Sequence, residues 1–140
     1  MGKQYWLVKS EPSAYAFDNL VRDGRTAWTG VRNSEARNNL NKMAQGDRVL
    51  FYHSNEGKCV VGVAEVRATA VDDETLPGQG WVSVELAPVE KLDHPVTLAQ
   101  IKADPALKEL PLITRSRLSV SQVRAGDYRH ILMLAKQTRG

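Results

Sequence analysis

A short apolar run at residues 46–54 limits the possible folds more than any other stretch of the chain. Gly46-Asp47 begins it and Asn55-Glu56-Gly57 follows it, so turn residues bound it on both sides, as expected for a strand. Side chains alternate across a strand. One face would therefore carry Val49, Phe51 and His53, and the other Leu50, Tyr52 and Ser54. Both faces are mainly apolar until the last residues, which predicts a central strand, covered on both sides, that ends at the floor of a pocket.

Patterns elsewhere in the chain predict further strands with helices between them. Strands are expected at residues 5–9, 26–29, 59–66, 81–86 and 118–121, and helices at 13–21, 34–43, 97–103, 106–110 and 127–135. Residues 72–80 and the polar segment around His94 are expected to be loops. Gly62, inside a strand, suggests a bulge or a close approach of another part of the chain. This order of elements favours a small α+β domain built on a curved sheet or barrel.

The start of the helix at 34–43 is a candidate binding point. Asn33 or Ser34 can cap it, and the first backbone amides of a helix have no partner within the helix. With Arg32 and Asn33 beside them, these amides form a natural site for an anion or for the polar edge of a base.

Composition limits the class of protein. A chain of 140 residues that is 42% hydrophobic and 25% charged is typical of one soluble globular domain. No apolar run approaches the roughly 18 residues that cross a membrane, so no membrane partner is expected, and no targeting peptide is visible. The lone cysteine, Cys59, fits a reducing cytoplasm and is interpreted as a core residue rather than a nucleophile. The oligomeric state stays open.

Charge is uneven along the chain. Basic residues outnumber acidic ones by nine to six in residues 1–58 and by six to one in residues 111–140, whereas acidic residues outnumber basic ones by nine to four in residues 59–110. A fold that brings the two ends together would have one positive and one negative face. A positive face attracts phosphates and other anions, although solubility alone would also explain it.

The chain carries no motif for metal binding, for a phosphate-binding glycine loop or for acyl transfer. Its histidines, His53, His94 and His130, have no cysteine or carboxylate at ligand spacing, and no metal or cofactor is expected. Serines that a fold could bring near His53 lack a nucleophile elbow and an orienting carboxylate. These observations favour a protein that is not an enzyme. A small enzyme using His53 as general base stays as the less favoured alternative.

Aromatic and polar side chains remain as the candidate binding material. Flat aromatic walls with a few hydrogen-bonding groups suit a planar heterocycle, because stacking supplies energy and edge contacts supply identity. Trp28 is the strongest aromatic candidate, since it lies beside Gly30 in a segment that leads to the open helix start. Phe51 and Trp81 are instead expected in the core.

At these residues the chain resembles the EVE domain family. The resemblance covers most of the chain, and six motifs in the right order carry it: Tyr5-Trp6-Leu7-Val8-Lys9-Ser10-Glu11-Pro12, Trp28-Thr29-Gly30-Val31-Arg32-Asn33, Ala36-Arg37-Asn38, Gly46-Asp47, Phe51-Tyr52-His53-Ser54 and Arg117-Leu118-Ser119-Val120. Two features depart from the family pattern. Gln122 replaces a usual proline, and the loop between Asp72 and Trp81 is shorter.

The resemblance implies a single EVE domain over residues 1–140 with a PUA-like fold, a small pseudo-barrel with peripheral helices that is similar to YTH domains. It also implies a module that holds a modified base of DNA or RNA, flipped out of its strand, in an aromatic pocket. A free heterocyclic or anionic ligand, such as a buffer molecule, is the alternative occupant. The implied ligand-binding residues are Lys9, Ser10, Trp28, Val31, Arg32, Asn33, Tyr52, His53, Ser54, Arg117, Leu118 and Ser119. Among them, Trp28 and Tyr52 would be walls, and Arg32 and Arg117 would contact phosphate or the outer edge of the ligand.

Overall fold

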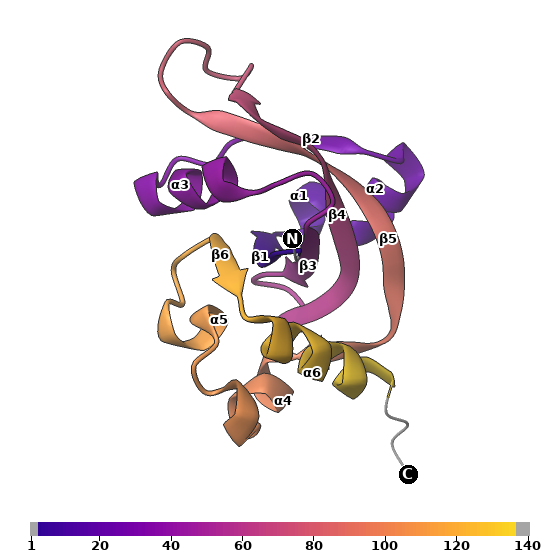
Figure 1. The fold of residues 1–140 in the computed structure, drawn as a ribbon. Coiled ribbons are helices and arrows are strands. Elements are labelled where there is room, and N and C mark those ends of the chain that lie inside the picture. The colour runs from indigo at the N-terminus through magenta and orange to yellow at the C-terminus, as the bar shows by residue number, and fades with distance from the viewer. Residues whose placement is uncertain (1–2, 137–140) are drawn as a thin grey trace.

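The computed structural model describes residues 3–136, which form one six-stranded sheet with helices around it (Figure 1). The strands are β1 (Tyr5–Ser10), β2 (Thr26–Trp28), β3 (Arg48–His53), β4 (Cys59–Asp72), β5 (Val82–Thr97) and β6 (Val120–Val123). The helices are α1 (Pro12–Tyr15), α2 (Phe17–Asp23), α3 (Ser34–Lys42), α4 (Leu98–Ala103), the 3-10 helix η1 (Pro105–Leu107), α5 (Pro111–Thr114) and α6 (Ala125–Lys136). No helix within residues 3–136 is long and apolar enough to cross a membrane.

The sheet is open and curved. Its strand order is β2-β5-β4-β3-β1-β6, with β1 and β3 parallel and the other neighbours antiparallel. The register between β4 and β5 shifts at four places. Such bulges bend strands and increase their twist, and Figure 1 shows both long strands curving around the inner part of the sheet. The predicted α+β fold on a curved sheet is confirmed.

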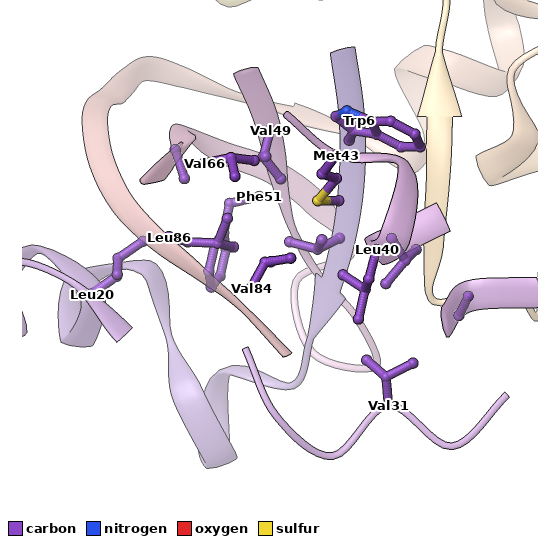
Figure 2. Packing of buried hydrophobic residues seen from close by; sticks show 14 of the residues in the cluster. Trp6, Leu20, Val31, Leu40, Met43, Val49, Phe51, Val66, Val84 and Leu86 are labelled. Atoms are coloured by element: carbon purple, nitrogen blue, oxygen red, sulfur yellow. The ribbon is translucent and has the colours of Figure 1, made fainter. Parts of the chain in front are cut away.

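Strand β3 separates two hydrophobic cores, as its alternation predicts. Val49 and Phe51 belong to the cluster that includes residues of α2 and α3, shown in Figure 2. Leu50 and Tyr52 belong to the cluster that includes residues of α4, α5 and α6. Both faces of this strand are therefore covered. Because burying one large apolar side chain contributes about 1.5–3 kcal/mol to stability, burial on both faces holds β3 firmly beside β1, whose last residues line the candidate site.

Gly62 marks both a bulge and a close approach, the two alternatives that its position suggests. The register of β4 shifts beside it relative to both neighbouring strands. A Cβ atom at Gly62 would lie 2.5 Å from the Phe17 ring, far inside van der Waals contact. The glycine therefore lets the first residue of α2 pack directly on the sheet.

The structure corrects several local predictions. His94 lies in β5 rather than a loop, because pairing with β4 continues as far as Thr97. The helix expected at 13–21 is two helices, since Ala16 has an extended backbone between them. The strand expected at 118–121 begins at Val120, after a turn in which Leu118 N donates to Arg115 O.

Candidate functional site

A cavity of about 600 Å³ opens where β1 and β2 end. The end of β1, helix α1, strand β2, the segment leading to α3 and the turn before β6 all contribute to its wall. Its lining residues are Lys9, Ser10, Glu11, Ala14, Tyr15, Thr26, Ala27, Trp28, Thr29, Gly30, Val31, Arg32, Asn33 and Ser119. We call this the base cavity. Its volume lies within the range of about 300–1,000 Å³ that small-molecule sites occupy.

Trp28 is held in this cavity by two other aromatic rings. Its ring meets Phe51 at a centroid distance of 5.5 Å and Tyr15 at 6.4 Å, both edge-to-face. The Tyr15 hydroxyl donates to Asp23 at 2.9 Å, which fixes that ring in turn. Edge-to-face packing of this kind is favourable and orients the rings. Trp28 itself stays only partly buried, so a pre-oriented indole borders the cavity.

Three polar side chains in the wall are oriented by hydrogen bonds to the fold. Ser10 Oγ donates to Tyr15 O at 2.5 Å, which leaves its lone pairs as acceptors. Asn33 Oδ1 accepts from Ala36 N at 2.9 Å, as expected for the cap of α3, and its NH₂ group stays a donor. Lys9 Nζ donates to Ser116 O at 2.5 Å, and burial lowers the pKa of Lys9. Acceptors and donors thus stand around one cavity in fixed orientations.

A buried carboxylate shapes the rim of the base cavity. Asp73 is fully buried and accepts from Gly30 N at 2.9 Å, from Arg32 Nη1 at 3.0 Å and from the amide and hydroxyl of Thr75. Burial alone would raise the pKa of Asp73, but these hydrogen bonds, led by that of the Thr75 hydroxyl, hold it well below its usual range. Gly30 has a left-handed φ of 83°, which a residue with a side chain rarely adopts. The carboxylate therefore ties the β4–β5 loop to the segment that follows Trp28.

Arg32 is occupied by this network. Its guanidinium also donates to Thr75 Oγ1 at 3.0 Å and lies 5.7 Å from the ring of Trp81, with Arg37 at 5.4 Å from the same ring. Trp81 is only partly buried, so its assignment to the core is wrong. Its ring lies instead against the guanidinium groups of two arginines. The structure gives Arg32 a part in holding the rim of the cavity that it also lines. The contact with phosphate or with the outer edge of the ligand, which the family resemblance implies, stays a prediction.

Eleven of the twelve implied site residues line three cavities. The base cavity contains Lys9, Ser10, Trp28, Val31, Arg32, Asn33 and Ser119. A second cavity contains Tyr52 and Ser54 and shares Lys9, and a third contains Arg117 and Leu118 and shares Asn33. Tyr52 does not share a cavity with Trp28, because alternation along β3 turns it toward the other core. The two therefore do not form opposite walls of one pocket.

His53 lines none of the three cavities. Its Nε2 atom accepts from Phe17 N at 3.1 Å, and its ring meets Phe51 edge-to-face at 5.7 Å. Burial lowers the pKa of His53, which favours the neutral form that can accept this bond. This geometry gives His53 a role in anchoring the start of α2. It does not supply the reach toward a substrate that a general base needs.

Two important residues lacked a clear signal in the sequence. Tyr15 follows a proline in a polar segment, and nothing in its spacing indicates that it supports Trp28. Asp73 lies in an acidic run that looks exposed, and only the Asp-x-Thr pattern, common in side-chain turns, hints at its hydrogen bonds. Within residues 3–136, no three His, Cys, Asp or Glu side chains are grouped so as to hold a metal ion.

The model of the EVE domain family matches residues 4–134 of this chain. The chain belongs to the EVE domain family. A protein of Schizosaccharomyces pombe is 32% identical to this EVE domain over 166 residues, a match that covers 96% of this chain and 70% of that relative. A crystal structure of an Agrobacterium tumefaciens protein is 39% identical, with a TM-score of 0.93 over 98% of this chain and 96% of the other.

Human thymocyte nuclear protein 1 (THYN1) is also similar to this EVE domain. Its crystal structure, in complex with DNA containing 5-methylcytosine, is 27% identical, with a TM-score of 0.89 over 98% of this chain and 100% of the other. A YTH domain from Zygosaccharomyces rouxii has a TM-score of 0.63 at 19% identity, which shows a shared fold. The resemblance to EVE domains and the PUA-like fold are thereby confirmed.

Proposed function

We propose that this EVE domain is a non-catalytic module that reads a modified base in nucleic acid. The observation that carries the proposal is the base cavity itself, which combines an oriented indole with fixed donors and acceptors. A flipped-out base would stack on Trp28, and its polar edge would bond Asn33, Ser10 and nearby backbone groups. Stacking on an aromatic ring is worth about 1–3 kcal/mol per base.

The similarity to human THYN1 supports a methylated cytosine as the first ligand to test, since that relative was crystallised with DNA containing 5-methylcytosine. The placement of His53 outside the cavities supports binding rather than catalysis. In this proposal residues 1–140 act as one domain, and Arg117 is the arginine that faces the phosphates of the strand. A cytoplasmic location stays a prediction.

The experiment is a titration of matched oligonucleotides, with cytosine or 5-methylcytosine at one position, in single-stranded and duplex form. Burying one methyl group adds about 0.8 kcal/mol, so we expect about fourfold tighter binding of the methylated oligonucleotide. Equal affinities across cytosine, 5-methylcytosine and 5-hydroxymethylcytosine would refute a reader of modified cytosine. Free 5-methylcytidine is the further probe, and if it bound as tightly as the oligonucleotide the ligand would be a small molecule.

A further inference from the structure

The second cavity, of about 420 Å³, is positively charged and lies next to the base cavity. The two share Lys9. Lys58 and Lys102 also line the second cavity, together with the polar side chains of Tyr52 and Ser54, and its lining contains no aspartate or glutamate. We call it the lysine cavity. Three ammonium groups around one hollow make a strong attraction for an anion.

Separate elements hold the three lysines in place. Lys9 is anchored at the end of β1 by its bond to Ser116 O. Lys58 lies in the turn between β3 and β4, and its carbonyl accepts from Leu98 N at 2.8 Å, which joins this turn to the start of α4. Lys102 lies in the last turn of α4. The grouping therefore depends on the tertiary fold, since no two of these lysines are close in sequence.

The lysine cavity carries charge that other groups do not neutralise. Within residues 3–136, neither Lys58 nor Lys102 takes part in an ion pair. Two arginines near the base cavity differ, because Arg32 is paired with Asp73 and Arg115 makes a two-pronged ion pair with Glu35. Arg117 resembles the two lysines, since it takes part in no ion pair among the described residues. Lys58 and Lys102 are thus able to attract further negative charge, as Arg117 is in the third cavity.

We propose that the lysine cavity binds the phosphate backbone of the nucleic acid strand beside the nucleotide held in the base cavity. This inference rests on the proposed function, and it adds the direction in which the strand runs. From the base on Trp28 the backbone passes Lys9 and then meets Lys58 and Lys102. Hydroxyl groups of Tyr52 and Ser54 lie in the same wall and can donate to phosphate oxygens.

Phosphate contacts raise affinity without reading sequence, and they make binding sensitive to salt. Each lost contact should lower the slope of log affinity against log salt by about 0.7 for a single strand and 0.9 for a duplex. At 0.1 M salt, the single-strand value corresponds to about a fivefold loss of affinity per lysine. The loss should be the same for modified and unmodified oligonucleotides.

The test uses Lys58→Gln, Lys102→Gln and the double variant, with Lys108→Gln as a matched control. Lys108 is an exposed lysine in the same part of the chain that lines none of the three cavities. Oligonucleotides with cytosine or 5-methylcytosine are titrated over a salt series. Each single lysine-cavity variant should bind both oligonucleotides about fivefold more weakly, and the double variant about 25-fold more weakly, with a shallower salt slope in each case. The ratio of the affinities for the two oligonucleotides should stay as in the unsubstituted protein. A thermal melt of each variant verifies folding.

The outcomes separate this inference from the proposed function. Losses no larger than that of Lys108→Gln would overturn the lysine cavity as a backbone site, even if the protein still prefers the methylated oligonucleotide. A shallower salt slope in the lysine variants would support the backbone site. If the unsubstituted protein also bound both oligonucleotides equally, the proposed reading of a modified base would be refuted while the backbone site stood. If the unmodified protein bound neither oligonucleotide, both proposals would fail.

Discussion

Trp28 is packed from the side by two aromatic rings, so a substitution can remove its stacking surface while keeping some of that packing. Trp28→Ala should weaken the binding of every base, by roughly 5- to 150-fold, since stacking is worth about 1–3 kcal/mol. Trp28→Phe keeps an aromatic ring against Phe51 and should bind more tightly than the alanine variant. Fluorescence polarisation with the methylated oligonucleotide measures both. Binding by Trp28→Ala as tight as that of the unmodified protein would remove Trp28 from the site.

His53 is expected to make stability depend on pH. Burial lowers the pKa of this imidazole, and nearby Lys91 adds to the effect while Asp18 opposes it. The unfolded chain therefore takes up a proton first as the pH falls below about 6.5, and folded stability decreases from there. His53→Gln keeps an acceptor for Phe17 N without titrating, so its stability deficit should narrow from pH 7.5 to pH 5. Urea unfolding between pH 7.5 and pH 5 measures the free energy of unfolding of both proteins, with His94→Gln as the matched control. A deficit that widened instead would contradict the structural role.

At the scale of elements, Asp73 joins the β4–β5 loop to the segment before α3. Asp73→Asn replaces an acceptor with a donor that faces the donors of Gly30, Arg32 and Thr75, and should cost about 1–3 kcal/mol. The pKa of Asp73 is lower in the folded protein than in the unfolded chain, where it is about 3.9. The carboxylate therefore stabilises the fold above that pH, and this stabilisation is lost as the pH falls further. Denaturant unfolding measures the free energy of unfolding of Asp73→Asn and of the unsubstituted protein at pH 7, 5 and 3. The difference between the two proteins should be the same at pH 7 and pH 5 and smaller at pH 3.

The neighbouring exposed residue Glu74 offers a control for this prediction. Glu74→Gln makes the same change of charge in the same loop, and should alter stability by less than about 0.5 kcal/mol. Equal effects of the two substitutions would mean that net charge, and not the bonds of Asp73, accounts for the result.

Alternation along single strands could be predicted from the sequence, whereas contacts between loops could not. The faces of β3 follow directly from residues 49–54, and the cap of α3 follows from Asn33. The same alternation already places Tyr52 on the face opposite Phe51, yet the family resemblance implies that Tyr52 and Trp28 are both walls of the pocket. The burial of Asp73 depends on where two distant loops meet, and an acidic run carries no pattern that reveals such a meeting.

At the scale of the whole molecule, the fold brings the two basic segments together, which the sequence left as a possibility. Strand β1 pairs with β6 on one side and with β3 on the other, so the two basic segments lie together. The acidic segment supplies the whole of β4 and β5. Residues that border the base cavity come from both basic segments. A nucleic acid strand bound there would therefore contact both segments and join them further. Binding should therefore stabilise the folded protein as a unit.

A thermal melt with oligonucleotides tests this coupling directly. A ligand present at 100 times its Kd stabilises the fold by about 2.7 kcal/mol, which for a chain of this size raises Tm by about 10 °C. At the same concentration, an unmodified oligonucleotide that binds fourfold more weakly should give a shift about 3 °C smaller. An oligonucleotide without a base at the target position keeps the phosphates, so its shift reports the backbone contacts alone. If that abasic strand raised Tm as much as the methylated one, the base cavity would contribute nothing to binding, and the indole of Trp28 would need another explanation.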